Sequence, residues 1–564
     1  MRSSARFSSS QRPKSRPFTP FWTLARPSCS GPEIGRCPTI MPRAARHTAP
    51  MAARPGSWGR SGMHPPVTLY KGTVADTHRE IESKFDVAPD FTLGEPADFA
   101  RPGATVASRT VNLESTYYDT AEHGLLRSGL TLRRRTGDAD TGWHLKVPGD
   151  GFRTELHWPL TGSDQPPDEL RNLIWPFAGT ADLHTTVTLR TLRTAHQVSD
   201  PDGRLMFELA DDEVRASSAG AQVAMSRWRE LEVELGPAGS TADLDRATGL
   251  LLRRGAYACR VSSKLRRALG RPDEPDTASA AAVLTSYLRA QCDAITAGHF
   301  AISDKPFEAS STSQPHEAVH QTRVATRRLR AALRTFGPLF DAGAATRLQD
   351  ELAWFAAELG EVRDREVLRN RLARAVDDLP AYLIVGPVGQ QIDEVLLTEL
   401  RQHADALLAT MRDERYRTLI ADLARWREQP AFTPEAAGPP GLLAEHVAAA
   451  ERKLARRMKR AAGHHTPAEQ LHQARKAGKR ARYAAEAAAP ALGKKASKLA
   501  KRASRLQTLL GEHQDAVVAT ELLRRIADQV ADEGKNAFTY GILVADQRRI
   551  AAASAQEARA STGS

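Results

Sequence analysis

The spacing of apolar residues divides the chain into two regions with different predicted structure. From about Thr68 to Leu269, short runs such as HREIESKFDV and WRELEVELG alternate apolar and polar residues, and turn signals such as PGDG and DPDG separate them. This period of two predicts antiparallel strands, and many short strands with one polar face indicate a barrel with a polar interior. From about Ala280 onward, a helical period filled with Ala, Leu, Arg and Glu predicts an all-α region.

The helical region contains an internal duplication. VHQTRVATRRLR, from Val319, returns as LHQARKAGKRAR from Leu471, and LGEVRDREV, from Leu359, returns as LGEHQDAVV from Leu510. The Pro-rich segment QPAFTPEAAGPPG lies between the two copies. Two landmarks repeated at nearly the same offset predict two helical units related by pseudo-symmetry.

The first 66 residues have a different composition. They hold eleven Lys or Arg and one acid, and they are rich in Ser and Pro, so we expect them not to fold alone. This composition fits either a transit peptide or an over-extended start with translation beginning at Met41, Met51 or Met63, and we favour the second. The predicted segments are a basic tail at 1–66, a strand-rich domain at 67–270, a linker at 271–279 and a helical domain at 280–555 with repeats at about 280–428 and 442–555.

The net charge of +12 is unevenly distributed. The tail carries +10, residues 67–276 carry −6 and residues 277–564 carry +8. The four cysteines form neither a disulfide pattern nor a metal-ligand spacing, and no apolar run approaches the roughly 20 residues that a membrane helix needs. We therefore expect a cytoplasmic protein with an acidic strand-rich domain and a basic helical one.

Acids and bases share faces of the predicted strands. Glu80, Glu82 and Lys84 alternate with Ile81, Ser83 and Phe85, so the three charged side chains point to one side. Such charges inside a barrel are costly unless a divalent cation and a polyanion accompany them, and carboxylates suit Mg²⁺ or Mn²⁺. The same alternation recurs at Glu230, Glu232 and Glu234, and further shared faces hold Arg133 with Arg135, His144 with Lys146, and Arg153 with Glu155.

A solvent-facing sheet would show alternating charge as well. Because five predicted strands show the same alternation, we expect their charged faces to line the barrel interior instead. EIESK at Glu80–Lys84 resembles the ExExK signature of the CYTH family, the triphosphate tunnel metalloenzymes. The order of TYYDT, LRRR, WHLKVPG, FRTE, ELADDEV, ELEVELG and SKLRRAL that follows is similar to that family over about residues 68–270.

This resemblance implies an eight-stranded antiparallel tunnel that hydrolyses triphosphate with Mg²⁺ or Mn²⁺. Carried over by position, the catalytic residues would be Glu80, Glu82 and Lys84, and the metal ligands would be Glu80, Glu82, Asp212, Glu232 and Glu234. The phosphate path would be lined by Lys84, Arg133, Arg135, Lys146, Arg153, Arg193 and Lys264. Arg190 competes with Arg193 for its position, Asp211 competes with Asp212, and Glu230 has no assigned role.

Basic residues form stripes in the helical region. His320, Arg323, Arg327, Arg330 and Arg334 follow the helical period where a core helix would place Leu. Residues 451–505 hold 17 bases against three acids, and such crowding favours an anionic partner over the alternative of a solvated basic face. The second copy of the stripe is His472, Arg475, Lys479 and Arg482.

The helical region resembles the CHAD family, the conserved-histidine α-helical domains, over about residues 280–550. VHQTRVATRRLRAALRTF followed by LGEVRDREVL carries the likeness, whereas LGEHQDAVV departs from it at His513 and Gln514. The resemblance implies that both stripes bind polyphosphate, with association with polyphosphate granules as a consequence. Asp364 and Asp515 either orient the stripes or form ordinary ion pairs.

Three functions are compatible with these patterns. A metal-dependent triphosphatase or short-chain polyphosphatase is preferred because both glutamate pairs are present. A non-catalytic polyphosphate-binding or targeting protein is the alternative. Nucleic-acid binding ranks low because only Phe336 and Tyr483 offer aromatic rings near the stripes. CYTH relatives also include adenylate cyclases and thiamine-triphosphate hydrolases, so the reaction is less defined than the class of ligand.

Overall fold

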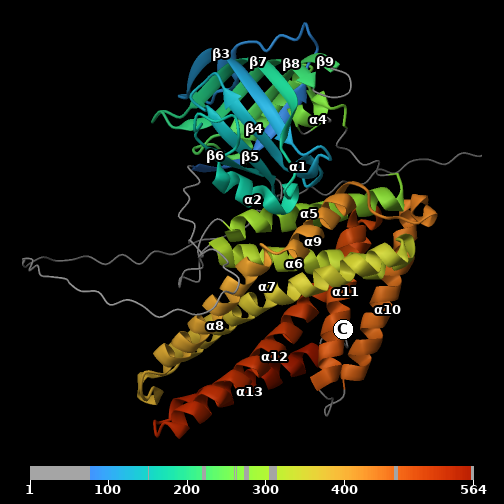
Figure 1. Cartoon of the computed structure of the whole chain (residues 1–564). Helices are drawn as coiled ribbons and strands as arrows, with labels where there is room; N and C mark the ends of the chain where they lie inside the picture. Colours follow the sequence, from blue (N-terminus) through green and yellow to red (C-terminus); the bar gives the residue numbers. More distant parts are fainter. Residues whose placement is uncertain are drawn as a thin grey trace, which may run out of the picture. The chain divides into compact units, whose positions relative to one another are not determined.

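The computed structural model describes residues 76–560, with gaps at 150–151, 219–223, 260, 262, 272–277, 304–313 and 463–467. The predicted tail at 1–66 and most of the predicted linker lie outside the described residues. The described chain holds an antiparallel sheet followed by an all-helical region (Figure 1). The predicted α+β class, with a sheet domain before a helical domain, is confirmed.

The described sheet domain contains strands of 2 to 16 residues, some joined by turns and others by segments that include helices. Period-two alternation places Trp143, Leu145 and Val147 on one face of the strand Gly142–Pro148 and His144 and Lys146 on the other, and residues of both faces are buried. The strands are β1 (Asp76–Glu80), β2 (Glu82–Asp86), β3 (Thr105–Asp119), β4 (Thr131–Thr136), β5 (Gly142–Pro148), β6 (Arg153–Trp158), β7 (His184–Ser199), β8 (Leu205–Ser218), β9 (Ala224–Leu235) and β10 (Tyr257–Ala258). The helices among them are α1 (Gly124–Arg127), α2 (Asp168–Ala178), α3 (Thr241–Arg253) and α4 (Lys264–Ala268).

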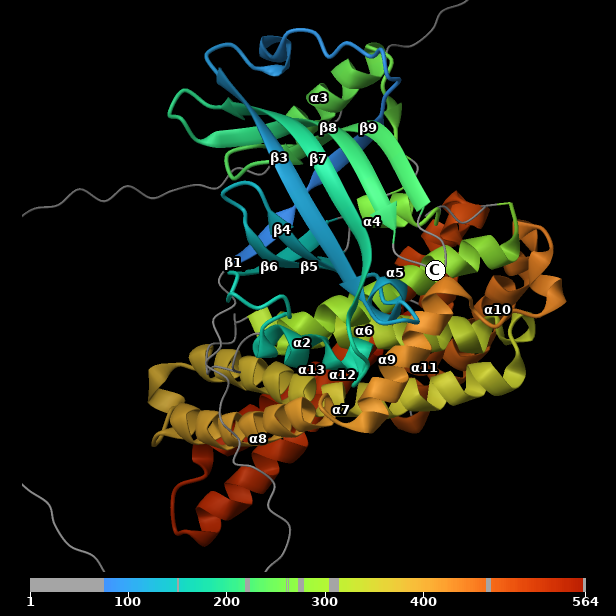
Figure 2. The ribbon, with the colours of Figure 1, turned by 45° about the horizontal axis from the view of Figure 1, so that its top comes forward.

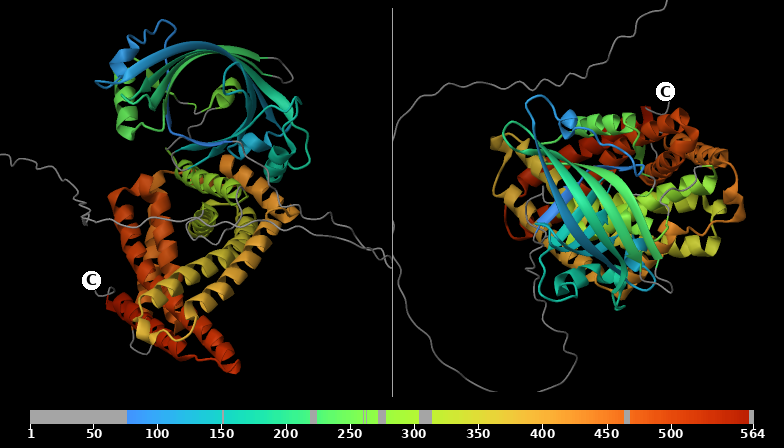
Figure 3. Two further views of the ribbon diagram at one scale, coloured as in Figure 1. Left: turned by 90° about the vertical axis from the view of Figure 1, so that its left-hand side faces the viewer. Right: turned by 90° about the horizontal axis from the view of Figure 1, so that it is seen from above.

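The described strands form one sheet in the order β1-β6-β5-β4-β3-β7-β8-β9-β2-β10. Figure 2 shows β3, β7, β8 and β9 side by side, and Figure 3 shows the sheet curving round on itself. The two halves are joined covalently, because β1 pairs with β6, β2 pairs with β9, and only Ile81 separates β1 from β2. No hydrogen-bonded ladder between β1 and β10 closes the described sheet, so the predicted closed tunnel of eight strands is not confirmed.

The outer face of the sheet carries an apolar core. Phe85, Leu231 and Val233, which alternate with the charged residues of β2 and β9, are buried together with Ala247 and Leu251 of α3. Burial of these side chains fixes the register, because a shift of one residue would turn the charged face toward α3. The opposite face is thereby held toward the interior of the curved sheet.

The helical region is built from long helices that pack in sequence. Their cores are rich in Leu and Ala, and small residues allow close approach; a Cβ added to Gly298 of α5 would collide with Thr322 of α6. The helices are α5 (Ala280–Ser303), α6 (Gln314–Thr335), α7 (Ala342–Asp377), α8 (Val388–Thr410), α9 (Glu414–Glu428), α10 (Leu443–Ala461), α11 (Ala468–Leu492), α12 (Lys494–Asp532) and α13 (Phe538–Ala560).

The predicted duplication appears as two runs of helices. α5 to α8 correspond in order and contacts to α10 to α13, and α6 and α11, which carry the two basic stripes, also contact one another. α9 precedes the Pro-rich segment between the runs and has no counterpart among the described helices. No described helix is both long and apolar enough to cross a membrane.

Candidate functional site

A cavity of about 370 Å³ lies on the polar side of the sheet, and we call it the sheet cavity. Its lining includes eight Lys or Arg and nine Asp or Glu among the described residues. All the residues that sequence reasoning assigned to the tunnel lie on its wall: Glu80, Glu82, Lys84, Arg133, Arg135, Lys146, Arg153, Arg193, Asp212, Glu232, Glu234 and Lys264.

The strand register brings opposite charges together across the cavity wall. Lys84 of β2 lies opposite Glu232 of β9, and Arg193 of β7 lies opposite Asp212 of β8. Neighbouring strands place such pairs about 5 Å apart, close enough to interact. The regular alternation of the sequence therefore becomes a continuous charged surface.

Glu232 lies at the centre of this surface. The amino groups of Lys84 and Lys264 bind its carboxylate, the latter at 2.6 Å, and a guanidinium nitrogen of Arg193 lies at 2.8 Å from its other oxygen. Burial would raise the pKa of Glu232, but the charges of Lys264, Lys84 and Arg193 outweigh it and hold that pKa well below its ordinary value. Glu232 is therefore a buried, ionised carboxylate held by three bases.

Asp212 is fully buried and is held in a similar way. Arg193 donates to both carboxylate oxygens, at 2.8 and 2.7 Å, and Lys264 lies at 3.0 Å. The competing residues point elsewhere, because Arg190 is 76% exposed and pairs with Glu114, whereas Asp211 pairs with Arg229. The geometry places Arg193 and Asp212 in the cavity.

A second charged group surrounds Glu155 of β6. Lys146 binds both oxygens of Glu80 at 2.7 and 2.8 Å, Arg133 donates to Glu155 at 3.0 Å, and His144 Nδ1 lies 3.2 Å from the same Glu155 oxygen. Burial raises the pKa of Glu80, against the opposing charge of Lys146. Glu155 shares a strand face with Arg153, but the strand pattern alone predicts no role for it.

Three carboxylates of the cavity region lie close enough to hold one metal ion. Asp212, Glu230 and Glu232 each offer an oxygen within 4.8 Å of the others. Oxygen-only ligands suit Mg²⁺ or Mn²⁺. Sequence reasoning left Glu230 unassigned, although its alternation with Glu232 was the signal that could have included it. Glu80, Glu82 and Glu234 lie on the wall of the same cavity but outside this group.

The cavity wall also includes polar residues that were not predicted, among them two on β3 and one each on β8 and β1. Tyr117, Glu208, Arg109 and His78 all line it, and His78 Nε2 lies 3.3 Å from Glu234. Strands were expected in these segments, β3, β8 and β1. Tyr117, Glu208 and Arg109 could not be selected from the sequence, because none of them belongs to an alternating pair of charged residues like those on the other strands.

In the helical region, the two basic stripes converge where α6 contacts α11. Burial and the charges of Arg327, Arg475 and Arg323 lower the pKa of Lys479 to about 7. Burial also lowers the pKa of Arg475, whose Nε has no hydrogen-bond partner among the described residues, although Asp515 opposes the shift. We call Arg323, Arg327, Arg475 and Lys479 the helical cation cluster.

The remaining stripe residues separate from this cluster. Burial, followed by the positive charge of Arg334, lowers the pKa of Arg330 and that of Arg480. Arg480 was not among the predicted residues. Arg482 pairs with Glu486 at 2.7 Å and with Gln507. One stripe thus contributes to more than one surface of the helical region.

The histidines at the heads of the stripes are half-buried. Burial, followed by the charge of Arg363, lowers the pKa of His320. His472 lies on α11 one turn after Glu469. Of the two aspartates, Asp364 pairs with Arg323 at 3.0 Å, whereas burial raises the pKa of Asp515 beside Arg475 and Arg371.

Two family models match the chain, the CYTH domain over residues 78–263 and the CHAD domain over residues 286–524. The chain is also similar to an uncharacterized protein of Mycobacterium tuberculosis, MT2285. The two are 32% identical over 496 residues, which cover 84% of this chain and 94% of that protein.

Solved structures match one region at a time. PptA from Streptomyces chartreusis is 23% identical to this chain, and the match covers 50% of this chain and 99% of the PptA chain with a TM-score of 0.41. The CHAD domain from the plant Ricinus communis is 26% identical, and the match covers 52% of this chain and 96% of that domain's chain with a TM-score of 0.40. HpAC1 from Hippeastrum, which has a dominant triphosphatase activity, is 16% identical. The match covers 34% of this chain and 96% of the HpAC1 chain with a TM-score of 0.23.

Proposed function

This chain belongs to the family of proteins that carry a CYTH domain followed by a CHAD domain, and we propose that its sheet cavity hydrolyses inorganic triphosphate or short polyphosphate with a divalent metal ion. We propose further that the helical cation cluster holds polyphosphate. The cytoplasm, in association with polyphosphate granules, is the expected location.

The near balance of charge in the sheet cavity carries the proposal. Eight bases face nine acids, so a polyanion entering alone would leave a large excess of negative charge. Divalent cations that enter with the polyanion would remove that excess, and the carboxylates that could bind them are already ionised and buried beside the bases. The cavity is thus suited to a metal–polyphosphate complex rather than to either ion alone.

Hydrolysis of triphosphate needs a water oxygen to bond to a terminal phosphorus while the bridging P–O bond breaks, giving phosphate and diphosphate. Lys84, Arg193 and Lys264 would stabilise the charge on the phosphate oxygens, since fixed cations in a buried site cost no reorganisation during the reaction. Asp212, Glu230 and Glu232, with Glu80, Glu82 and Glu234, would hold Mg²⁺ or Mn²⁺. Such an ion supplies Lewis-acid chemistry and lowers the pKa of bound water.

The test is phosphate release from tripolyphosphate by the full chain and by Glu82→Ala. Glu82 binds Lys84 at 2.9 Å on the cavity wall, so its loss removes a proposed metal ligand. We expect a fall in rate of at least about 10²-fold, the scale at which single electrostatic groups act in catalysis. Glu213→Ala is the matched control, because Glu213 of β8 is 47% exposed and pairs with Arg227.

Full activity of Glu82→Ala would remove this residue from the proposed site. A second candidate, a polyphosphate-binding protein without catalysis, is favoured by the helical cation cluster considered alone. It predicts polyphosphate retention by the unmodified chain with no phosphate release under any metal condition.

A further inference from the structure

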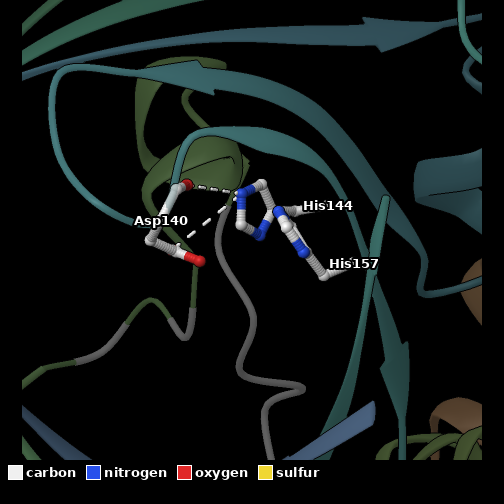
Figure 4. A group of neighbouring side chains, drawn as sticks. All are labelled: Asp140, His144 and His157. Carbon is white, nitrogen blue, oxygen red and sulfur yellow. Dashed lines mark hydrogen bonds and ion pairs between the residues drawn. The ribbon is translucent and has the colours of Figure 1, made fainter. Parts of the chain in front are cut away.

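One group of side chains on the wall of the sheet cavity differs from all the others in its chemistry. Asp140, His144 and His157 each offer a ligand atom within 4.8 Å of the other two. His144 lies on β5 and His157 on β6, where the register sets them directly opposite each other, and their ring centroids are 4.8 Å apart. Asp140 comes from the turn before β5, and Figure 4 shows its side chain beside the two imidazoles.

The surroundings hold these ligands in place. His144 is fully buried, and Gly142 leaves room for the imidazole of His157, which a Cβ at position 142 would strike. His144 Nε2 lies 3.0 Å from the backbone oxygen of Asp140, and His144 Nδ1 lies 3.2 Å from Glu155. A histidine that binds a metal through one nitrogen commonly turns the other toward a carboxylate, which is the position of Glu155, and Nε2 would then bind the ion in place of its contact with the Asp140 backbone oxygen.

The group is better suited to a cation than to phosphate. Asp138 lies beside this group, since its carboxylate accepts the backbone N–H of Asp140 at 3.0 Å, so two carboxylates stand there against the single guanidinium that pairs with Asp140 among the described residues, that of Arg135. Two nitrogens bound to one zinc ion at about 2.0–2.1 Å lie about 4 Å apart or less, so only a small closing movement is needed. Arg135 donates to one carboxylate oxygen of Asp140 at 2.9 Å, and that same oxygen lies 3.9 Å from His144 Nε2, so a metal ion bound there would share it with the guanidinium.

We propose that Asp140, His144 and His157 form a second cation site in the sheet cavity, one that takes an imidazole-preferring divalent ion such as Zn²⁺, Co²⁺ or Ni²⁺. This ion class differs from the Mg²⁺ or Mn²⁺ that the oxygen-only carboxylates favour. The two sites would bind different metals within one cavity. The proposal concerns binding alone and holds whether or not the cavity hydrolyses triphosphate.

Co²⁺ is a suitable probe because its visible absorption reports nitrogen ligands. The full chain, freed of metal with a chelator, is titrated with Co²⁺ in the presence of excess Mg²⁺, and Zn²⁺ is then added. We expect Co²⁺ binding that Mg²⁺ does not prevent and that Zn²⁺ displaces. His157→Ala and Asp140→Asn should each weaken it by at least about 10- to 100-fold, the loss that even an outer-shell change produces.

Two variants serve as controls. His78→Ala removes a histidine from the same cavity that pairs with Glu234 instead, and its Co²⁺ affinity should match that of the unmodified chain. Glu232→Gln alters the carboxylate group but should keep the Co²⁺ absorption. Because His157 is half-buried and Asp140 is exposed, their variants test the site even if a change at buried His144 prevents folding.

Absence of Co²⁺ binding in the unmodified chain would overturn the proposal. So would unchanged binding in both His157→Ala and Asp140→Asn, or loss of the absorption in Glu232→Gln alone, which would place the ion among the carboxylates. None of these results depends on phosphate release, so failure of this site and failure of the triphosphatase proposal can be told apart.

Discussion

In the sheet cavity each central acid lies against a base, whereas the cations of the helical cluster lie mainly against one another. Glu232 is held by three bases, but Lys479 is surrounded by Arg323, Arg327 and Arg475, with Asp515 as an opposing charge. A paired surface can accept a polyanion only if metal ions accompany it, while a crowded cationic surface is stabilised by the polyanion itself. One ligand class can therefore be handled by two different electrostatic designs in one chain.

Removal of a base from the paired surface should have the largest effect on stability. Arg193→Met leaves fully buried Asp212 with Lys264 as its remaining basic partner and removes one of three bases from Glu232. Breaking a buried ion pair costs about 3–5 kcal/mol, because the partner charge stays buried. The free energy of unfolding, measured by urea denaturation, should fall by that amount.

Arg190→Met is the matched control, because Arg190 lies on the same strand, is 76% exposed and pairs only with Glu114 among the ion pairs of the described residues. We expect a change within about 0.5 kcal/mol. Equal losses in both variants would mean that the cavity pairs contribute no more than surface ones, and the contrast between the two regions would lose its basis.

Removal of a base from the crowded surface should have the opposite sign. Lys479 has a pKa of about 7 in the folded chain, below its ordinary value, so its charge destabilises the fold most fully below pH 7. That destabilisation declines as the pH rises from 7 toward the ordinary lysine value. Lys479→Met should therefore raise the melting temperature, and the gain should be larger at pH 6 than at pH 9.

Polyphosphate binding should report the same group. A bound anion favours the charged form of Lys479, so polyphosphate affinity should decrease from pH 6 to pH 9 in the unmodified chain and change less in Lys479→Met. A pH profile that is identical in the two proteins would show that another group governs it.

The smallest effect is expected at the edge of the cluster. Asp364, 59% exposed, pairs with Arg323, and such surface pairs contribute about 0–1 kcal/mol. If it is an ordinary ion pair, Asp364→Asn should leave stability almost unchanged and raise polyphosphate affinity slightly, since a competing carboxylate is gone. A clear fall in affinity, measured by titration calorimetry, would instead indicate that Asp364 orients Arg323 for the anion.

The sequence predicted the cavity wall well because strand alternation is a local property. Side chains alternate between the two faces of a strand. Once Glu80 and Lys84 are placed on the polar face, the face of each other residue of the same predicted strand follows from its position in the sequence. The histidine pair was beyond reach for the opposite reason. His144 and His157 meet only through the register of β5 with β6, and that register is a property of strand pairing rather than of either segment.

The helical stripes show a similar limit. The stripe from His320 to Arg334 covers fifteen residues, which is about 21 Å of helix, and the surroundings change along that length. Periodicity predicted that these residues share one face of α6. The packing of α6 against α11 then determines that the charge of Arg327 lowers the pKa of Lys479, whereas the charge of Arg334 lowers the pKa of Arg480. Sheet closure is likewise not readable locally, because Ile81 divides one predicted strand into β1 and β2, which pair with different partners.

The most direct test uses one preparation of the full chain and two substrates, with Mg²⁺ or Mn²⁺ and then with EDTA. Phosphate release from tripolyphosphate reports the sheet cavity, and retention of long-chain polyphosphate reports the helical cation cluster. We predict that EDTA stops release and leaves retention intact. Release that continues in EDTA, or release and retention that are lost together, would contradict the account.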